Sequence, residues 1–374
     1  SPTRGTFWYR AAIDIPIRVA HYWQTQTFVK HFLAASQVTD FLNVLALMSN
    51  FAIVPGLAYG SQLALGALGV TLVYGVLRFS NFAHGEIMSF GAMATILVTW
   101  ALQARGISLG PLPTALLALP VGIAITIGLC LVTDRLVYRY YRQAKTQPVT
   151  YLIVSVGLMF LLGGLIRFII GPNDQVFNDG TRFILKAGAF KAMTGLDQGL
   201  AIKTSQSITV VTAVIIVCVL FWFLNKTRAG KSMRAYSDNE DLALLSGINP
   251  ERVVMVTWII TGALACIAGT LYGLDKSYKP FTFLQLLLPI FASAIVGGIG
   301  NPFGAIAGGF VIAFSELFVT FAYKKVLAYL LPSGFAPDGL VQLLSTDYKF
   351  SVSFMILVIV LLIKPTGLFS GRTL

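Results

Sequence analysis

Three polar residues, Asn81, His84 and Glu86, stand where one long apolar run ends and the next begins. Ionisable side chains are costly in such surroundings, so they are expected to face protein or water and to have a function. In the purely structural alternative, Asn81 and Glu86 cap a helix N-terminus and oppose its dipole. One histidine and one carboxylate are too few ligands for zinc, so the sequence predicts no metal site and no cofactor.

Residues 231–247 form a second polar feature, a charged amphipathic island between two apolar runs. We expect it to form a short helix whose water-facing side meets a soluble partner. Its candidate contact residues are Arg234, Asp238, Asn239, Glu240, Leu245 and Gly247. The Gly-Lys-Ser at 230–232 superficially suggests a phosphate loop, but such a loop needs a glycine where Asn225 stands, so nucleotide binding by this chain is excluded.

Glycines with helix-packing spacing make a third feature. Gly60 lies on a glycine-studded apolar run, and Gly297, Gly298, Gly300 and Gly304 surround Asn301-Pro302. Small residues spaced in this way let helices approach closely, and Asn-Pro signals a turn. The pattern predicts a sharp turn between two tightly packed helices.

Composition places these features in a membrane protein. Hydrophobic residues make up 56% of the 374 and charged residues 11%, with a mean hydropathy of +0.78. The net charge of +12 is scattered over short connections without a basic aromatic groove, which favours lipid contact and excludes nucleic acid. His84 is the only histidine beyond residue 31, and the sequence has no paired carboxylates for acid-base chemistry, so we predict no enzyme.

The predicted fold is all-α, a polytopic bundle of about eight to ten membrane helices within residues 37–370. Residues 1–36 are expected to form an interfacial amphipathic segment with aromatic anchors. Good candidate spans are 57–78, 84–103, 112–133, 150–170, 206–225, 254–273 and 303–322, and weaker ones are 37–55, 284–299 and 351–363.

The connections 134–149 and 226–253 are rich in Lys and Arg and are separated by two spans, so both are predicted to be cytoplasmic. The C-terminus then also lies inside. On this topology the cluster of Asn81, His84 and Glu86 falls near the cytoplasmic face, far from the midplane where transporters usually bind solute. It is therefore predicted to be a hinge or gate rather than a substrate site.

Three motifs in order resemble the permease subunits of ABC transporters for branched-chain and other neutral amino acids. They are the glycine-studded helix leading into NFAHGE at 81–86, the segment TRAGKSMRAYSDNEDLALLSGIN at 227–249 and AIVGGIGNPFGAIAGGF at 294–310. The resemblance covers about 56–322 and, more loosely, 351–370.

The resemblance implies a multi-pass permease subunit in a bacterial inner membrane, importing neutral amino acids. It implies a second permease subunit, two cytoplasmic ATPases that dock on residues 231–247 within the coupling loop 226–253, and an external solute-binding protein. Closely similar permeases move urea or short amides. A stand-alone channel or secondary carrier is the alternative of another class, but it would have no use for the exposed amphipathic segment.

Overall fold

The computed structural model describes residues 38–177, 179–330, 339, 341–364 and 366–369. The predicted amphipathic segment 1–36 lies outside these residues. The predicted all-α bundle is confirmed, because eight helices are long and apolar enough to cross a membrane. They are Val38–Leu77, His84–Ala104 (α3), Ala115–Gln143, Pro148–Ile170 (α6), Thr204–Lys226 (α8), Pro250–Lys276 (α11), Pro302–Val319 (α13) and Thr346–Ile363. A ninth, shorter apolar helix is α12, Thr282–Gly297.

The first span differs from the predicted pair 37–55 and 57–78, because it is one helix of 40 residues. It contains a π-helical turn, Ser49–Ile53, followed by α2, Val54–Leu77. Pro55 stands at the start of α2 and cannot donate an amide to the preceding turn. A local π turn accommodates such a missing hydrogen bond without ending the helix.

The chain forms two compact units. The smaller one contains the described parts of 1–49 and 322–341 together with Ala187–Leu200, which includes α7, Ala187–Thr194. Gln198 ties it together, since its backbone N–H donates to Asn43 Oδ1 at 3.1 Å and its side-chain amide to the Tyr329 hydroxyl at 2.8 Å. The remaining helices form the larger unit.

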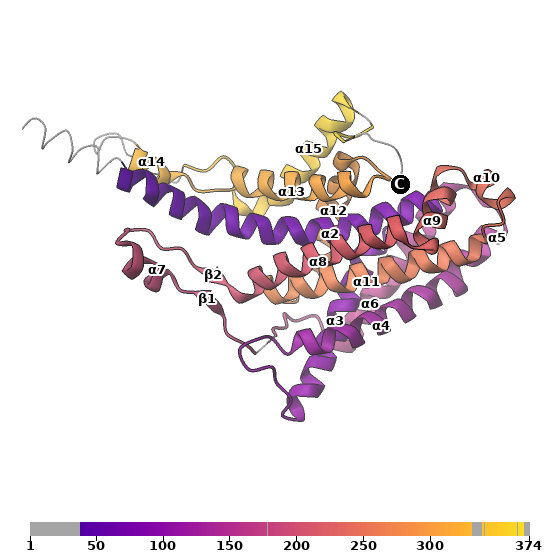
Figure 1. Ribbon diagram of the computed structural model, residues 1–374, viewed down its shortest axis with the longest axis horizontal. Coiled ribbons are helices and arrows are strands. Elements are labelled where there is room, and N and C mark those ends of the chain that lie inside the picture. Colours follow the sequence, from indigo (N-terminus) through magenta and orange to yellow (C-terminus); the bar gives the residue numbers. More distant parts are fainter. Residues whose placement is uncertain (1–37, 178, 331–338, 340, 365, 370–374) are drawn as a thin grey trace, which may run out of the picture. The chain divides into compact units, whose positions relative to one another are not determined.

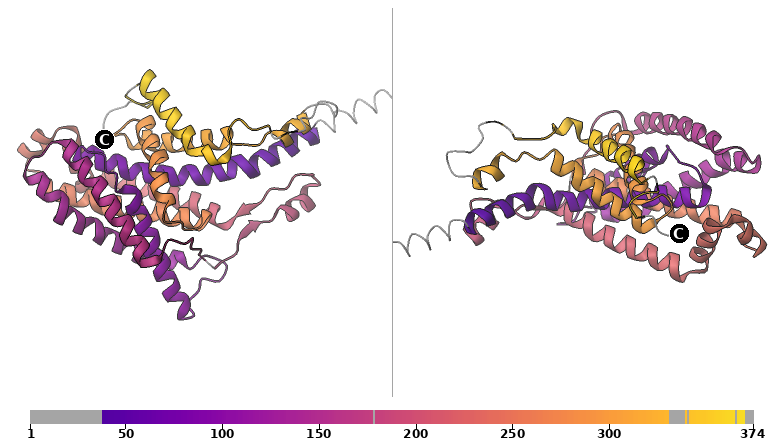
Figure 2. Two further views of the ribbon diagram at one scale, coloured as in Figure 1. Left: turned by 180° about the vertical axis from the view of Figure 1, so that it is seen from behind. Right: turned by 90° about the horizontal axis from the view of Figure 1, so that it is seen from above.

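Helix α2 is the centre of the larger unit. It packs against α8, α11, α12 and α13, which surround it in Figures 1 and 2. Nineteen of its 24 residues are buried, so its apolar side chains face protein on every side. A helix that is hydrophobic all round is expected to occupy such a position.

Capping residues set where the helices of this unit begin. The Asn249 side chain accepts hydrogen bonds from the N–H groups of Glu251 and Arg252, and Pro250 occupies the first turn of α11. The same arrangement starts α13, where Asn301 caps the amides of Phe303 and Gly304. Asn followed by Pro satisfies free amides and preorganises the first turn.

Two ends of the larger unit can be distinguished. One end is named here the α9 end after helix α9, Arg228–Asp238. It brings together residues 134–148 and 227–249, and Arg142 contacts Glu251 at the start of α11 there at 3.4 Å. Residues 298–301 and 366–369 lie here too. Phe303 stacks on Phe221 of the last turns of α8 with ring centroids 4.0 Å apart, and Asn301 Nδ2 donates to the Phe369 carbonyl at 2.9 Å.

The opposite end, called here the strand end, carries the only strands in the described residues. They are β1, Phe183–Leu185, and β2, Ile202–Lys203, which pair antiparallel between α6 and α8. The backbones of Gln175 and Tyr278 exchange hydrogen bonds of 2.8 Å in both directions and hold this connection to the end of α11.

Candidate functional site

Residues 231–247 form two short helices rather than the predicted single one. Helix α9, Arg228–Asp238, begins at Thr227, whose hydroxyl accepts from the Gly230 amide at 3.0 Å. Helix α10, Glu240–Leu245, begins at Asn239, whose side chain accepts from the Leu242 amide at 3.0 Å. Asn239 has an extended backbone and ends α9 while it caps α10. Asn caps a helix well because its side chain replaces a missing backbone acceptor.

Helix α9 lies against the bundle through Gly230, Met233, Tyr236 and Ser237, which are all buried. A Cβ at Gly230 would come within 2.6 Å of the Leu224 Cα, so only glycine permits this close approach to the end of α8. The amphipathic pattern of the segment therefore has a buried face directed at the membrane helices and an exposed face directed away.

Two polar contacts fasten α9 to the end of α2. The Ser237 hydroxyl donates to the Gly75 carbonyl at 2.8 Å. The guanidinium of Arg78, which follows α2 in a left-handed conformation with φ of 56°, donates in return to the Ser237 carbonyl. These two contacts connect α9 directly to the central helix.

A third contact joins α9 to α10 across the break at Asn239. The Tyr236 hydroxyl donates to Glu240 Oε1 at 2.6 Å. Burial raises the pKa of Tyr236 above its ordinary value, and the hydrogen bond to Glu240 raises it further. The phenol therefore keeps its proton at neutral pH and donates it to the Glu240 carboxylate across the break.

The outer face of the segment is apolar as well as charged. Leu242 is 61% exposed and Leu245 84% exposed, beside the exposed carboxylates of Asp238, Glu240 and Asp241. Gly247 ends the surface in a left-handed turn with φ of 79°. Arg234 differs, because it is half-buried and its Nε has no hydrogen-bond partner among the described residues. Leu245 therefore presents far more surface to a partner than Arg234 does.

The side chains of Asn81, His84 and Glu86 lie at different levels of the bundle, and Asn81 bonds to Tyr138 at the α9 end. The His84 ring lies against Gly69, where a Cβ would stand 2.6 Å from its Cε1. Gly69 is eight residues, about 12 Å, before the end of α2 at Leu77. The chain thus re-enters the bundle over residues 78–83, and α3 begins with the buried side chain of His84.

Each of the three side chains is buried in different surroundings. Asn81 Oδ1 accepts from the Tyr138 hydroxyl and from the Ala83 amide, both at 3.1 Å, while its side-chain nitrogen has no partner in the described structure. Neither ring nitrogen of His84 makes a hydrogen bond of ordinary geometry within the same residues. Residues two apart on a helix do not share a face, so His84 and Glu86 point to different neighbours: His84 lies against Gly69, and Glu86 lies beside Gly163.

Glu86 faces a basic residue from another helix. A Cβ at Gly163 of α6 would stand 3.2 Å from Glu86 Oε1 and 3.1 Å from Arg167 Nη2, so both charged groups border the space left by this glycine. They form no direct ion pair within 4.0 Å among the described residues, and Glu86 Oε2 has no hydrogen-bond partner there. The guanidinium of Arg167 lies over the Phe281 ring at 4.8 Å.

The glycines identified in the sequence lie at close approaches. A Cβ on Gly297 of α12 would overlap the carbonyl of Gly304 of α13, and a Cβ on Gly304 would overlap that of Gly297. On α2, a Cβ at Gly60 would stand 2.5 Å from the Phe310 ring. Gly298 and Gly300 form the turn with φ of 104° and 87°.

One charged cluster at the α9 end was not identified from the sequence. Asp134 accepts from Arg142 at 2.9 Å and from the Trp258 indole at 2.8 Å, and Arg142 also reaches Glu251. These contacts join the end of the third span, Ala115–Gln143, to the first turns of α11. Trp258 and Glu251 are more than 100 residues away from Asp134 and Arg142 in the sequence. The one sequence signal is the carboxylate of Asp134 at the end of an apolar run, which would need a partner there.

No group of three or more potential metal-ligating side chains occurs in the described parts of the chain. The structure instead shows a helical bundle in which the exposed segment of α9 and α10 is hydrogen-bonded to the central helix α2. Residues 52–361 match the family described as branched-chain amino acid transport system / permease component. The chain belongs to this permease family.

Curated relatives of this permease match over most of their length. It is 30% identical over 319 residues to the high-affinity branched-chain amino acid transport system permease protein LivH of Escherichia coli K12, covering 84% of this chain and 92% of LivH. It is 27% identical to BraD of Pseudomonas aeruginosa over 84% of this chain and 94% of BraD. A solved structure, PsaBC from Streptococcus pneumoniae in complex with Fab, aligns with a TM-score of 0.43 at 12% identity, covering 84% of this chain and 91% of that one. Family membership makes this chain a transport subunit rather than an enzyme.

Proposed function

We propose that this permease imports neutral, branched-chain amino acids and that a separate ATPase drives it through α9 and α10. The family description and the names of LivH and BraD support the substrate class. The observation that carries the coupling is the exposed surface around Leu242 and Leu245, which stands on a segment fastened to α2. A channel or secondary carrier would gain nothing from such a surface.

Coupling then follows from the contacts of α9. Contacts of the ATPase with α10 would move α9, because Tyr236 and Glu240 hold the two helices together. The Ser237 and Arg78 contacts would carry that movement to α2, against which four other membrane helices pack. Binding energy drives such a change only if the docking contacts differ between the two states.

The complete transporter is proposed to contain this permease, a second permease subunit, two ATPases and an external solute-binding protein. The α9 end is assigned to the cytoplasm of a bacterial inner membrane, because the Lys/Arg-rich connections 134–149 and 226–253 meet there. Residues 366–369 lie at the same end, so the C-terminus is proposed to be cytoplasmic. The strand end is then external and faces the solute-binding protein.

Asn81, His84 and Glu86 are proposed to act as a polar gate within the bundle rather than at its surface. Their side chains are buried, and Glu86 and Arg167 approach the same space beside Gly163. A small shift of α3 against α6 would open or close that space. Buried ionisable groups without full hydrogen bonding are costly, and a function in transport accounts for them.

Uptake competition tests the substrate class. Cells or proteoliposomes with the complete set of subunits should accumulate labelled leucine, and unlabelled leucine should compete better than alanine or glutamine, with urea ineffective. Competition by urea alone would transfer the proposal to urea or short amides. Uptake that continues without the ATPase would favour a channel or secondary carrier.

A further inference from the structure

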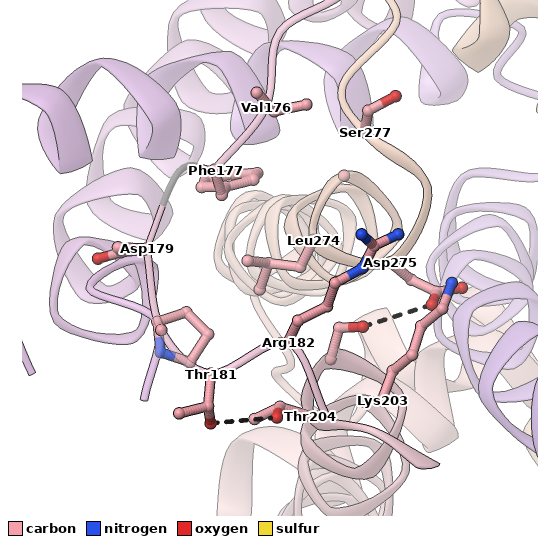
Figure 3. Close-up of a pocket in the computed structure, with 14 residues that line it drawn as sticks. Val176, Phe177, Asp179, Thr181, Arg182, Lys203, Thr204, Leu274, Asp275 and Ser277 are labelled. Carbon is pink, nitrogen blue, oxygen red and sulfur yellow. Dashed lines mark hydrogen bonds between the residues drawn. The ribbon is translucent and has the colours of Figure 1, made fainter. Parts of the chain in front are cut away.

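A pocket of about 590 Å³ opens at the strand end of the larger unit. It is lined by the connection after α6, the start of α8 and the end of α11 (Figure 3). Binding sites for small molecules commonly enclose about 300–1,000 Å³ and combine an apolar wall with a few polar groups. This pocket has both kinds of wall.

Cationic groups converge on one part of the pocket. Arg182 precedes β1 and Lys203 ends β2, and Figure 3 shows both side chains reaching toward the end of α11. Neither forms an ion pair within the described residues. Helix α8 begins beside them at Thr204 and directs the positive end of its dipole here. These groups are suited to a carboxylate.

An anionic group lies beside them at the end of α11 (Figure 3). The side chain of Asp275 is only 1% exposed, and its Oδ1 accepts from the Ser205 hydroxyl at 3.4 Å. Its Oδ2 has no hydrogen-bond partner in the described structure, and the Lys276 ammonium approaches it only at 3.5 Å. A buried carboxylate oxygen without a donor is costly, and a ligand ammonium would supply the missing hydrogen bond.

Apolar side chains complete the pocket. Pro113, Val176, Phe177 and Leu274 line it, and Figure 3 shows Phe177 and Leu274 beside the space above Arg182. A compound with a carboxylate, an ammonium and a short branched apolar chain meets all three surroundings at once. A simple anion would leave Asp275 Oδ2 without a hydrogen-bond donor.

We propose that this pocket binds a neutral α-amino acid as its zwitterion, with the carboxylate at Arg182 and Lys203 and the ammonium at Asp275. The proposal rests on the proposed function and adds to it a binding site in the permease itself. The amino acid would occupy this site after it leaves the solute-binding protein and before it passes between the helices.

The test measures equilibrium binding to the complete permease–ATPase complex without the solute-binding protein. The probes are L-leucine, leucinamide, which lacks the carboxylate, and 4-methylpentanoate, which lacks the ammonium. Replacing both Arg182→Gln and Lys203→Gln should weaken leucine binding by roughly tenfold or more and leave leucinamide unchanged. Asp275→Asn should weaken leucine by a similar factor and leave 4-methylpentanoate unchanged. Arg105→Gln is the control, because it removes an exposed charge outside the pocket. It should leave the binding of all three probes unchanged.

Several results would overturn the proposal. The binding site would be rejected if the wild-type complex binds no detectable leucine, or if the Arg182 and Lys203 replacements do not change leucine binding. Neither result would contradict the proposed function, provided that the complete transporter still takes up leucine. Binding of 4-methylpentanoate as tight as leucine would reduce the pocket to an anion site. Failure of the wild-type transporter to take up any neutral amino acid would instead reject the proposed function. If Asp275→Asn lowers the melting temperature of the complex, its effect on binding could come from instability. The combined replacement of Arg182 and Lys203 then decides the outcome.

Discussion

The Ser237 hydroxyl donates a 2.8 Å hydrogen bond to the Gly75 carbonyl, which fastens α9 to the last turn of the most buried helix in the bundle. Gly75 is three residues before Arg78, whose guanidinium donates to the Ser237 carbonyl. The contact is therefore reciprocal, and it connects the water-facing segment to the membrane helices without a flexible link.

Ser237→Ala is expected to impair coupling more than assembly. It removes one buried hydrogen bond, which contributes about 1 kcal/mol, while the exposed face of α10 stays intact. The number of ATP molecules hydrolysed per leucine transported should rise, and ATPase co-purification should be unchanged. Ser232→Ala is the control, because among the described residues the Ser232 hydroxyl bonds to the Arg228 carbonyl within α9 itself. An unchanged ratio in Ser237→Ala would show that this contact does not transmit movement.

Asn239→Ala should loosen α10. It removes the side-chain acceptor of the Leu242 amide, and loss of such a cap typically costs about 0.5–2 kcal/mol. ATPase binding to the permease should weaken, while Asn239→Asp should retain it because aspartate caps equally well. The dissociation constant of the ATPase from purified permease checks this. Equal weakening in both variants would mean that Asn239 contacts the partner directly and does not act through the cap.

Gly304→Ala should destabilise the permease. An added methyl group would meet the Gly297 carbonyl, and overpacking typically costs about 1–3 kcal/mol. The melting temperature of the purified protein should fall, and Gly304→Leu should abolish expression. Gly164→Ala is the matched control, since nothing lies within 4 Å of a Cβ at that position of α6. A normal melting temperature for Gly304→Ala would contradict the tight contact between α12 and α13.

The apolar runs predicted the fold well because burial in lipid or protein requires long hydrophobic helices. The turn at Asn301-Pro302 was also predicted correctly, because Asn301 and Pro302 set the start of α13 through contacts with their neighbours in the sequence. The break at Asn239 was not, because the charge pattern of 231–247 fits one continuous helix and the cap depends on backbone geometry. The packing of the His84 ring against Gly69 was not predicted either, because a contact between two helices is contained in no local pattern.

Glu86→Gln should lower the transport rate without changing the order of preference among amino acids. The substitution keeps the size of the side chain and removes the charge that faces Arg167 across the space at Gly163. Initial uptake rates for leucine, alanine and glutamine, measured with the same solute-binding protein, check this, and Arg167→Gln should give the same pattern. A changed order in both variants would place these residues in contact with the solute.

The most direct test of coupling through α10 is co-purification of the ATPase with Leu245→Asp. Leu245 is 84% exposed, so its replacement should leave the permease folded and eluting as a single species. We predict that the ATPase no longer co-purifies and that ATP-dependent leucine uptake is lost. Met193→Asp, at an 81% exposed position on α7, should retain both. If the ATPase still co-purifies with Leu245→Asp and uptake is normal, α10 is not the docking surface.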